Sequence, residues 1–144
     1  MNKVHIDMST PGRTTAGRSA ALLWTGRVMS GLVVLFLLFD SVIKLMAIPV
    51  VGETLAALGY APDLARGLGV LTLVATVLYA VPRTSVLGAV LLTGLFGGAM
   101  ASHLRVDNPV FSHLLFGLYL GLLAWGGLYL RKPRLRSLLP LAVR

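Results

Sequence analysis

The residues with the clearest chemical potential lie between His103 and His113, in the stretch His-Leu-Arg-Val-Asp-Asn-Pro-Val-Phe-Ser-His. This stretch holds two of the three histidines of the chain, together with Arg105 and Asp107. Histidine titrates near neutral pH and is tuned by a nearby carboxylate or arginine, so it can move protons or polarise an oxygen atom. Long apolar segments flank the stretch, which predicts a short turn between two membrane helices.

A second pair of ionisable residues, Asp40 and Lys44, lies inside the first apolar segment. The two are four positions apart, so on a helix they share one face and can pair. A single charge near the bilayer centre costs about 2.5–3.5 kcal/mol on insertion scales, and pairing and turning inward offset that cost. We therefore expect this face to point toward protein or a wet cavity, not toward lipid.

The composition predicts a membrane protein. Of the 144 residues, 56% are hydrophobic and 12% are charged, whereas soluble domains average about 45–50% and about 25%. The chain has no cysteine, which excludes disulfides, thiolate metal sites and dithiol redox chemistry. Its net charge is +8, but the basic residues lie at the ends of apolar segments and in the tails. Membrane topology explains this placement better than nucleic-acid binding does.

Four apolar segments predict an all-α, integral membrane four-helix bundle, because about 20 residues cross the roughly 30 Å hydrocarbon layer. The predicted spans cover about 22–48, 64–81, 86–103 and 110–130 of the helical domain 22–139. We expect residues 1–21 to form a disordered basic tail and 140–144 a C-terminal tail. The connector 50–63 is predicted to hold one or two turns of interfacial helix that Gly59 closes.

Lysine and arginine are concentrated on one side of this predicted topology. Four spans place both termini on the same side as the turn Pro82–Ser85, and that side carries the basic residues of both tails. Outside the spans, the other side has only Arg66 and Arg105. The positive-inside rule then predicts cytoplasmic termini, in the inner membrane of a bacterium.

This topology brings ionisable residues from three helices to a similar depth in the outward half of the bundle. The convergence predicts an outward-facing polar pocket, with five ligand-binding candidates: Asp40, Lys44, His103, Arg105 and His113. Each has an alternative interpretation as a structural ion pair, an interfacial histidine or a solvated loop charge. The histidine spacing matches no recognised metal-binding pattern, so no metal site is predicted.

Several short motifs resemble the DoxX-like family of small four-helix membrane proteins. They occur in the same order and cover about Gly26 to Leu139: Arg27–Asp40, Lys44-Leu45, Leu58–Pro62, Leu78–Ser85, Gly97–Val106 and Tyr129–Arg136. The resemblance implies a four-helix membrane bundle. Relatives in the wider DoxX group include the small membrane subunit of a thiosulfate:quinone oxidoreductase and proteins tied to oxidative-stress complexes.

The resemblance carries over Asp40, Lys44, His103, Arg105 and His113 as matching positions, with one departure. Thr72 stands where many members have an acidic residue, and Ala75 lies near a position that is sometimes a cysteine. If that acid helps to relay protons, its absence weakens a redox role for this chain.

Two functions follow as hypotheses. In the first, the outward pocket binds a quinone-like or other small amphiphile, as the membrane subunit of an oxidoreductase system with membrane or periplasmic partner proteins. His103 and His113 contact or protonate the ligand, Arg105 holds an anionic or carbonyl oxygen, and Asp40–Lys44 form the pocket floor. In the second, the protein is a non-catalytic scaffold, able to oligomerise, whose polar residues fix helix packing. A transporter is disfavoured because the inward half lacks ionisable residues.

Overall fold

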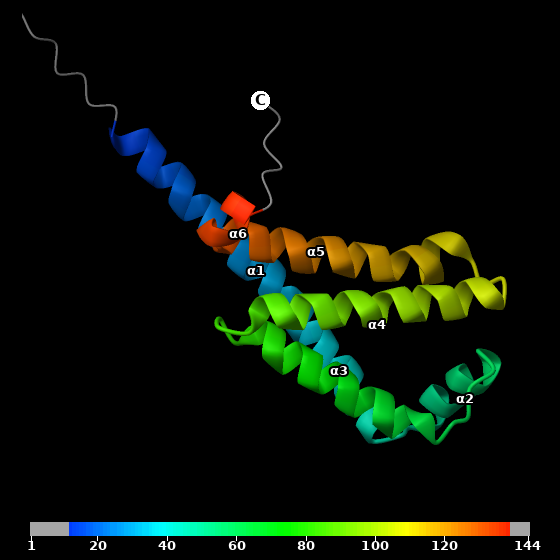
Figure 1. The fold of residues 1–144 in the computed structure, drawn as a ribbon. Coiled ribbons are helices and arrows are strands. Elements are labelled where there is room, and N and C mark those ends of the chain that lie inside the picture. Colours follow the sequence, from blue (N-terminus) through cyan, green and yellow to red (C-terminus); the bar gives the residue numbers. More distant parts are fainter. Residues whose placement is uncertain (1–11, 139–144) are drawn as a thin grey trace, which may run out of the picture.

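The first helix, α1 (Gly12–Leu45), is the longest element in the described part of the chain (Figure 1). The computed structural model describes the backbone of residues 12–138 and, except at 12–16, 18, 113 and 114, their side chains. The helix begins at Gly12 and not at the predicted Leu22, because alanine and arginine favour helix and no proline lies between Pro11 and Pro49. Residues 1–11 of the predicted tail lie outside the described residues.

The remaining elements are also helices, which confirms the all-α prediction for the described range. A short helix, α2, follows α1 with Pro49 at its first position, where proline is well tolerated. Three long helices follow, and a short segment lies on each side of the third one. Their bounds are α2 Pro49–Ala57, α3 Leu64–Ala80, α4 Ser85–Arg105, the π-helix η1 Val110–Leu114, α5 Leu115–Arg131 and α6 Pro133–Leu138.

Among the described residues, the long helices pack in a closed order. α1 lies against α3 and α5, and α4 lies against the same two neighbours. The tight turn from Val81 to Thr84 makes α3 and α4 an antiparallel hairpin, whose helices diverge away from the turn (Figure 1). At the turn, the two backbones touch, because a Cβ atom on Gly88 would lie 2.2 Å from the backbone nitrogen of Tyr79.

The buried core lies where α1, α3, α4 and α5 meet. It includes the fully buried side chains of Val33, Tyr79, Leu92 and Leu128. The Tyr79 hydroxyl is bonded to two other helices, at 3.0 Å from Ser30 Oγ and 2.8 Å from the carbonyl oxygen of Ala124. The tyrosine therefore joins α1, α3 and α5 at one point.

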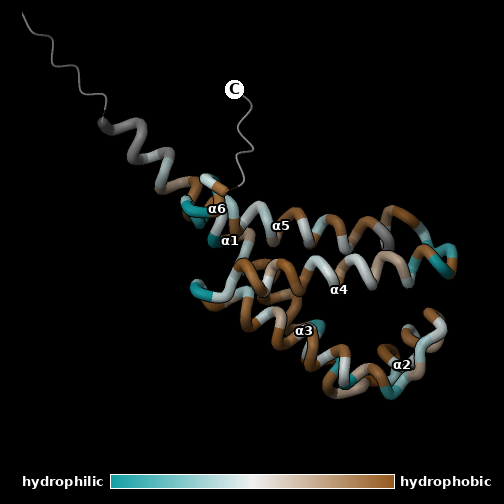
Figure 2. The backbone as a smooth tube through the Cα atoms, in the orientation of Figure 1, coloured by the Kyte–Doolittle hydropathy of each residue, from teal (hydrophilic) through white to brown (hydrophobic). Residues whose placement is uncertain are grey.

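Apolar residues predominate along the long helices, and hydrophilic residues gather toward the two ends of the molecule (Figure 2). Phe39 on α1 and Leu122 on α5 are 65% and 62% exposed, as expected where lipid and not water surrounds the helices. Three helical stretches in the described range are long and apolar enough to cross a membrane: Ser19–Leu45, Ser85–Arg105 and Val110–Arg131. α3 is equally apolar in character but shorter, with 17 residues.

One end of the molecule, which we call the basic end, carries the α3–α4 turn, α6 and Arg83, Arg131, Lys132, Arg134 and Arg136. Several of these side chains cap helix C-termini. Arg131 donates to the carbonyl of Tyr79 at 3.3 Å, Lys132 donates to that of Pro82 at 2.5 Å, and Arg136 donates to those of Tyr129 and Leu130. Cations near the last carbonyls of a helix also complement its dipole.

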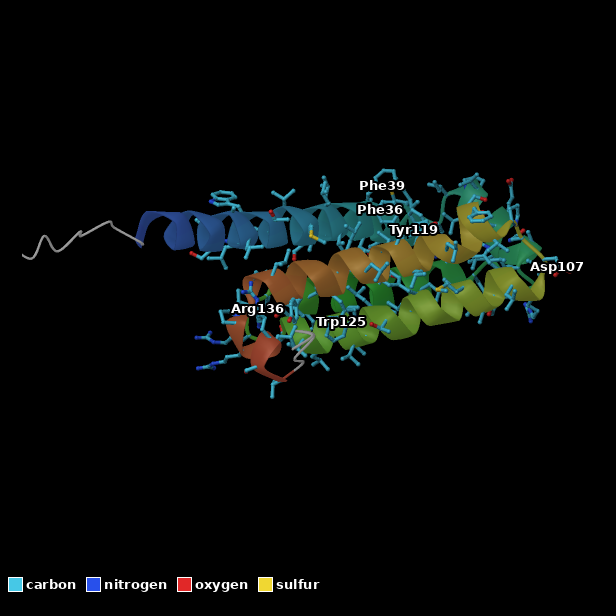
Figure 3. The ribbon with its side chains drawn as sticks, turned by 90° about the horizontal axis from the view of Figure 1, so that it is seen from above. Phe36, Phe39, Asp107, Tyr119, Trp125 and Arg136 are labelled. Atoms are coloured by element: carbon cyan, nitrogen blue, oxygen red, sulfur yellow. The ribbon has the colours of Figure 1, made fainter. Side chains whose placement is uncertain are left out.

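The opposite end, which we call the α2 end, carries α2 and the turn after α4. Figure 3 places Asp107 at this end and Arg136 at the basic end. Three helices finish here in the same backbone motif, with a left-handed residue after the helix: Ala47 (φ 48°), Gly59 (φ 75°) and Asp107 (φ 53°). In each, that residue and the next one donate to carbonyls of the last helical turn, as in a Schellman motif.

Candidate ligand-binding cavity

A cavity of about 890 Å³ lies at the α2 end, between α1, α2, α3, α4 and the start of α5. Its volume falls in the range of about 300–1,000 Å³ that is typical of small-molecule sites. Most of the lining is aliphatic or aromatic. The polar lining residues are Asp40, Lys44, Thr54, Tyr60, Thr72, Ser102 and His103. The structure thus gathers three of the five predicted site residues, Asp40, Lys44 and His103, around one cavity.

Asp40 and Lys44 form an ion pair on the cavity wall. Lys44 Nζ lies 2.5 Å from Asp40 Oδ2, and the two side chains are 26% and 24% exposed. The pair is local, because both residues project from the same face of α1 one turn apart. In the described structure this is the single bond of the ammonium group, so two of its three N–H donors remain available to a ligand.

Tyr60 and Ser102 add a polar contact that the sequence analysis did not predict. Their side-chain oxygens lie 2.8 Å apart. Ser102 also donates to the carbonyl of Gly98 at 2.8 Å. Because a serine hydroxyl has one proton, Tyr60 is the donor to Ser102, and its phenolic oxygen can still accept a bond. The two residues are 42 positions apart, so no local pattern reveals the pair.

His103 lies half-buried near the end of α4, where it lines the cavity. Its Nδ1 atom is 2.8 Å from the side-chain nitrogen of Asn108. An amide nitrogen only donates, so Nδ1 accepts and the neutral ring carries its proton on Nε2. The Schellman motif at the end of α4 sets this geometry, because Asn108 also donates its backbone N–H to the carbonyl of His103.

Arg105 does not line the cavity. Its guanidinium group donates to the carbonyl of Leu58 and lies 5.5 Å from the centre of the Tyr60 ring. The guanidinium group also packs against the backbone of Gly59, since a Cβ atom on Gly59 would be 2.9 Å from Arg105 Nη2. Arg105 thus contacts the α2–α3 connector, and its predicted contact with a ligand oxygen stays a prediction.

The last predicted site residue, His113, lies in the π-helix η1, and its side chain is outside the described residues. Single π-turns are rare and frequently found at functional sites. The prediction that His113 contacts a ligand therefore stays a prediction.

Thr72 faces the cavity at the position where the family resemblance led us to look for an acid. Its side chain is buried, and its hydroxyl donates to the carbonyl of Leu68 at 2.9 Å. Ala75, one turn further, is fully buried in the core. Thr72 therefore supplies a hydroxyl and no ionisable group at this point of the cavity wall.

A second, more open hollow of about 590 Å³ lies between the end of α1, α2 and the start of α3. It contains the charged residues Glu53, Asp63 and Arg66. Across the described part of the chain, histidine, aspartate and glutamate side chains form no group of three or more that could hold a metal ion.

The apolar helices and the cavity define the class of this molecule: a helical membrane protein with a mostly apolar cavity that several polar side chains line. The chain matches the model of the DoxX-like family over residues 28–127. It belongs to that family, which confirms the resemblance seen in its motifs. Comparison with the curated proteins and with the solved structures gives no significant match.

Proposed function

We propose that this protein binds a small amphiphilic molecule with a quinone-like head group in the cavity at the α2 end, as the membrane subunit of an oxidoreductase system. The observation that carries the proposal is the composition of the cavity wall. An ion pair, a tyrosine and a histidine contribute to the wall of a site whose lining is mostly aliphatic and aromatic. Such a site suits a ligand with a few polar atoms on an apolar body.

The quinone assignment rests on the chemistry of the two parts of the wall. A quinone has two carbonyl oxygens, which need hydrogen-bond donors, and a planar ring, which needs apolar contacts. Lys44 supplies N–H donors beside Asp40. Phe36 and Phe116 supply aromatic surface in the same cavity, with ring centroids 5.3 Å apart at 67°. His103 and Asp40 are the lining groups able to exchange a proton with a reduced ligand.

The proposed topology is a four-span, multi-pass protein of a bacterial inner membrane with cytoplasmic termini. α3 is the fourth span in this proposal. Its 17 residues extend about 25 Å at about 1.5 Å per residue, the lower limit for a membrane helix. α3 is supported on two sides by α1 and α4. The basic end then lies in the cytoplasm, by the positive-inside rule.

The alternative function is that of a non-catalytic scaffold whose polar residues fix helix packing. The bonds of Tyr79 to Ser30 and Ala124 favour it, because they join three helices. The ion pair of Asp40 and Lys44 does not favour the scaffold function, because it lies within α1 and holds no other helix in place. The two functions therefore depend on different residues, which allows them to be separated.

A direct test is to titrate decyl-benzoquinone into the purified protein in lipid nanodiscs and to count bound molecules by native mass spectrometry. The double variant Asp40→Asn/Lys44→Gln removes both charges of the ion pair and should weaken binding. Thr25→Val is the matched control, because Thr25 lies on the same helix and bonds only to the carbonyl of Ala21, at 3.0 Å in the described structure. Equal binding by the double variant and the control would refute the proposal.

A further inference from the structure

The cavity is bounded by three glycines that no packing contact explains. Gly67 on α3 and Gly94 and Gly98 on α4 all line it, and a Cβ atom on any of them would have nothing within 4 Å. Glycines in membrane helices usually let two backbones approach. Gly127 does this on α5, where a Cβ would lie 2.6 Å from Ser30 Oγ. At the cavity, the missing side chains leave open space instead.

This space lies between α3 and α4, which both contribute lining residues. The two helices meet at their turn and diverge toward the α2 end (Figure 1). Leu71 on α3 and Leu91 on α4 line the cavity and are 47% and 37% exposed. The lining that the two helices contribute there is therefore apolar on both sides. Apolar surface at membrane depth faces hydrocarbon chains.

The α2 end, by contrast, is held shut by side chains. Tyr60 is bonded to Ser102, and Arg105 is bonded to the carbonyl of Leu58. These contacts tie the connector between α2 and α3 to the last turn of α4. These contacts thus cover the cavity at the α2 end, while glycines and leucines of α3 and α4 line it between the two helices.

We propose that the gap between α3 and α4 is a lateral portal that admits the hydrocarbon chain of a membrane amphiphile from the bilayer. Gly67, Gly94 and Gly98 determine specificity, because they leave room for a chain that any larger side chain would fill. The head group of the same molecule lies against Asp40 and Lys44. This inference rests on the proposed function for the cavity, and it adds the class of ligand, one with an alkyl or isoprenoid chain, and its route.

The test is photo-crosslinking in phosphatidylcholine nanodiscs with palmitic acid that carries a diazirine near the end of its chain. Adducts are located by peptide mass spectrometry. A chain inside the cavity labels the buried lining residues Leu37, Thr72 and Leu120. A chain that only surrounds the protein labels outward-facing residues such as Phe39 and Leu122.

The informative variants are Gly94→Leu and Gly98→Leu, compared with Gly97→Leu and Gly31→Leu. All four positions have free space for a Cβ, but Gly97 and Gly31 do not line the cavity. We expect the interior adducts in the wild type and in the two controls, and their loss in Gly94→Leu and Gly98→Leu. Thermal unfolding of each variant shows that the bundle is intact.

Adducts confined to Phe39, Leu122 and similar outer positions would overturn the portal, as would interior adducts that are unchanged in both Gly94→Leu and Gly98→Leu. Failure of the proposed function has a different signature. In that case decyl-benzoquinone does not bind, whereas palmitic acid still labels the interior through the portal. Conversely, if decyl-benzoquinone binds but palmitic acid does not label the interior, the head-group site is supported and the lateral route is refuted.

Discussion

Tyr60 donates a hydrogen bond to Ser102 across 2.8 Å, and this bond joins the α2–α3 connector to the last turn of α4. The connector and α4 are distant in sequence, and α2 itself packs mainly on α3. Together with the Arg105 bond to Leu58, this contact holds the cover of the cavity in place. The polar residues at the α2 end thus divide into those that line the cavity and those that close it.

Replacing Tyr60 by phenylalanine removes the donor to Ser102 without removing the ring on which Arg105 lies. A hydrogen bond contributes about 0.5–1.5 kcal/mol, so we expect a small loss of stability. Hydrogen exchange should accelerate locally, at residues 58–63. Tyr119→Phe is the control, because Tyr119 is exposed and has no hydrogen-bond partner among the described residues. Unchanged exchange at the connector would show that the Tyr60 bond does not hold it.

The left-handed positions at the α2 end predict stability changes of opposite sign. Gly59 has φ 75° and lies under Arg105. Gly59→Ala should destabilise the protein by about 1–2 kcal/mol, the cost of a left-handed residue with a Cβ. Ala47 already bears that cost at φ 48°. Ala47→Gly should therefore stabilise by up to about 1 kcal/mol after the loss of chain entropy.

Thermal unfolding in one detergent measures both glycine substitutions. The assignment of a Schellman motif to both positions predicts opposite effects on stability: Gly59→Ala adds a methyl group and destabilises, whereas Ala47→Gly removes one and stabilises. A fall in the unfolding temperature of both variants would contradict it.

Tyr79→Phe separates packing from ligand binding. It removes the hydroxyl that bonds to Ser30 and to the carbonyl of Ala124 in the core, which leaves the buried Ser30 hydroxyl without this partner. Such a loss costs about 1–3 kcal/mol. Quinone binding should be unchanged, because Tyr79 does not line the cavity. A parallel loss of binding and stability would instead indicate that the site depends on overall helix packing.

The ion pair predicts non-additive effects on stability. Lys44→Gln leaves the Asp40 carboxylate without the partner it has at 2.5 Å, and Asp40→Asn leaves Lys44 unpaired in the same way. An unpaired charge inside a bundle is less favourable than none. Each single variant should unfold at a lower temperature than Asp40→Asn/Lys44→Gln. A double variant that equals the sum of both single effects would show that the two side chains are not coupled.

The sequence predicted local features of this fold well. The spans 64–81 and 86–103 correspond to α3 and α4 within two residues, because proline and the loss of hydropathy mark their ends. The Asp40–Lys44 pair was predictable because helical spacing alone brings the two side chains together. The start of α1 was not predictable from its own residues. Its first turns are polar, and they are helical because they continue the helix of the apolar segment.

Contacts between distant segments were beyond local reasoning. Arg105 and Leu58 are 47 positions apart, and Tyr60 and Ser102 are 42 apart. Which of two neighbouring residues faces the cavity depends on how far α4 rotates about its axis. For this reason local reasoning could not separate His103, which lines the cavity, from Arg105, which lies against the connector.

The central claim is that the cavity holds a membrane amphiphile, and the most direct measurement asks whether one is already bound. The protein can be extracted with its surrounding lipid in polymer nanodiscs, and its mass determined by native mass spectrometry. We predict one small amphiphile retained per wild-type chain and by Gly97→Leu, and its absence from Gly94→Leu/Gly98→Leu, in which the cavity of about 890 Å³ is partly filled. A wild-type chain that carries no such molecule, or a filled variant that carries the same one, would contradict the account.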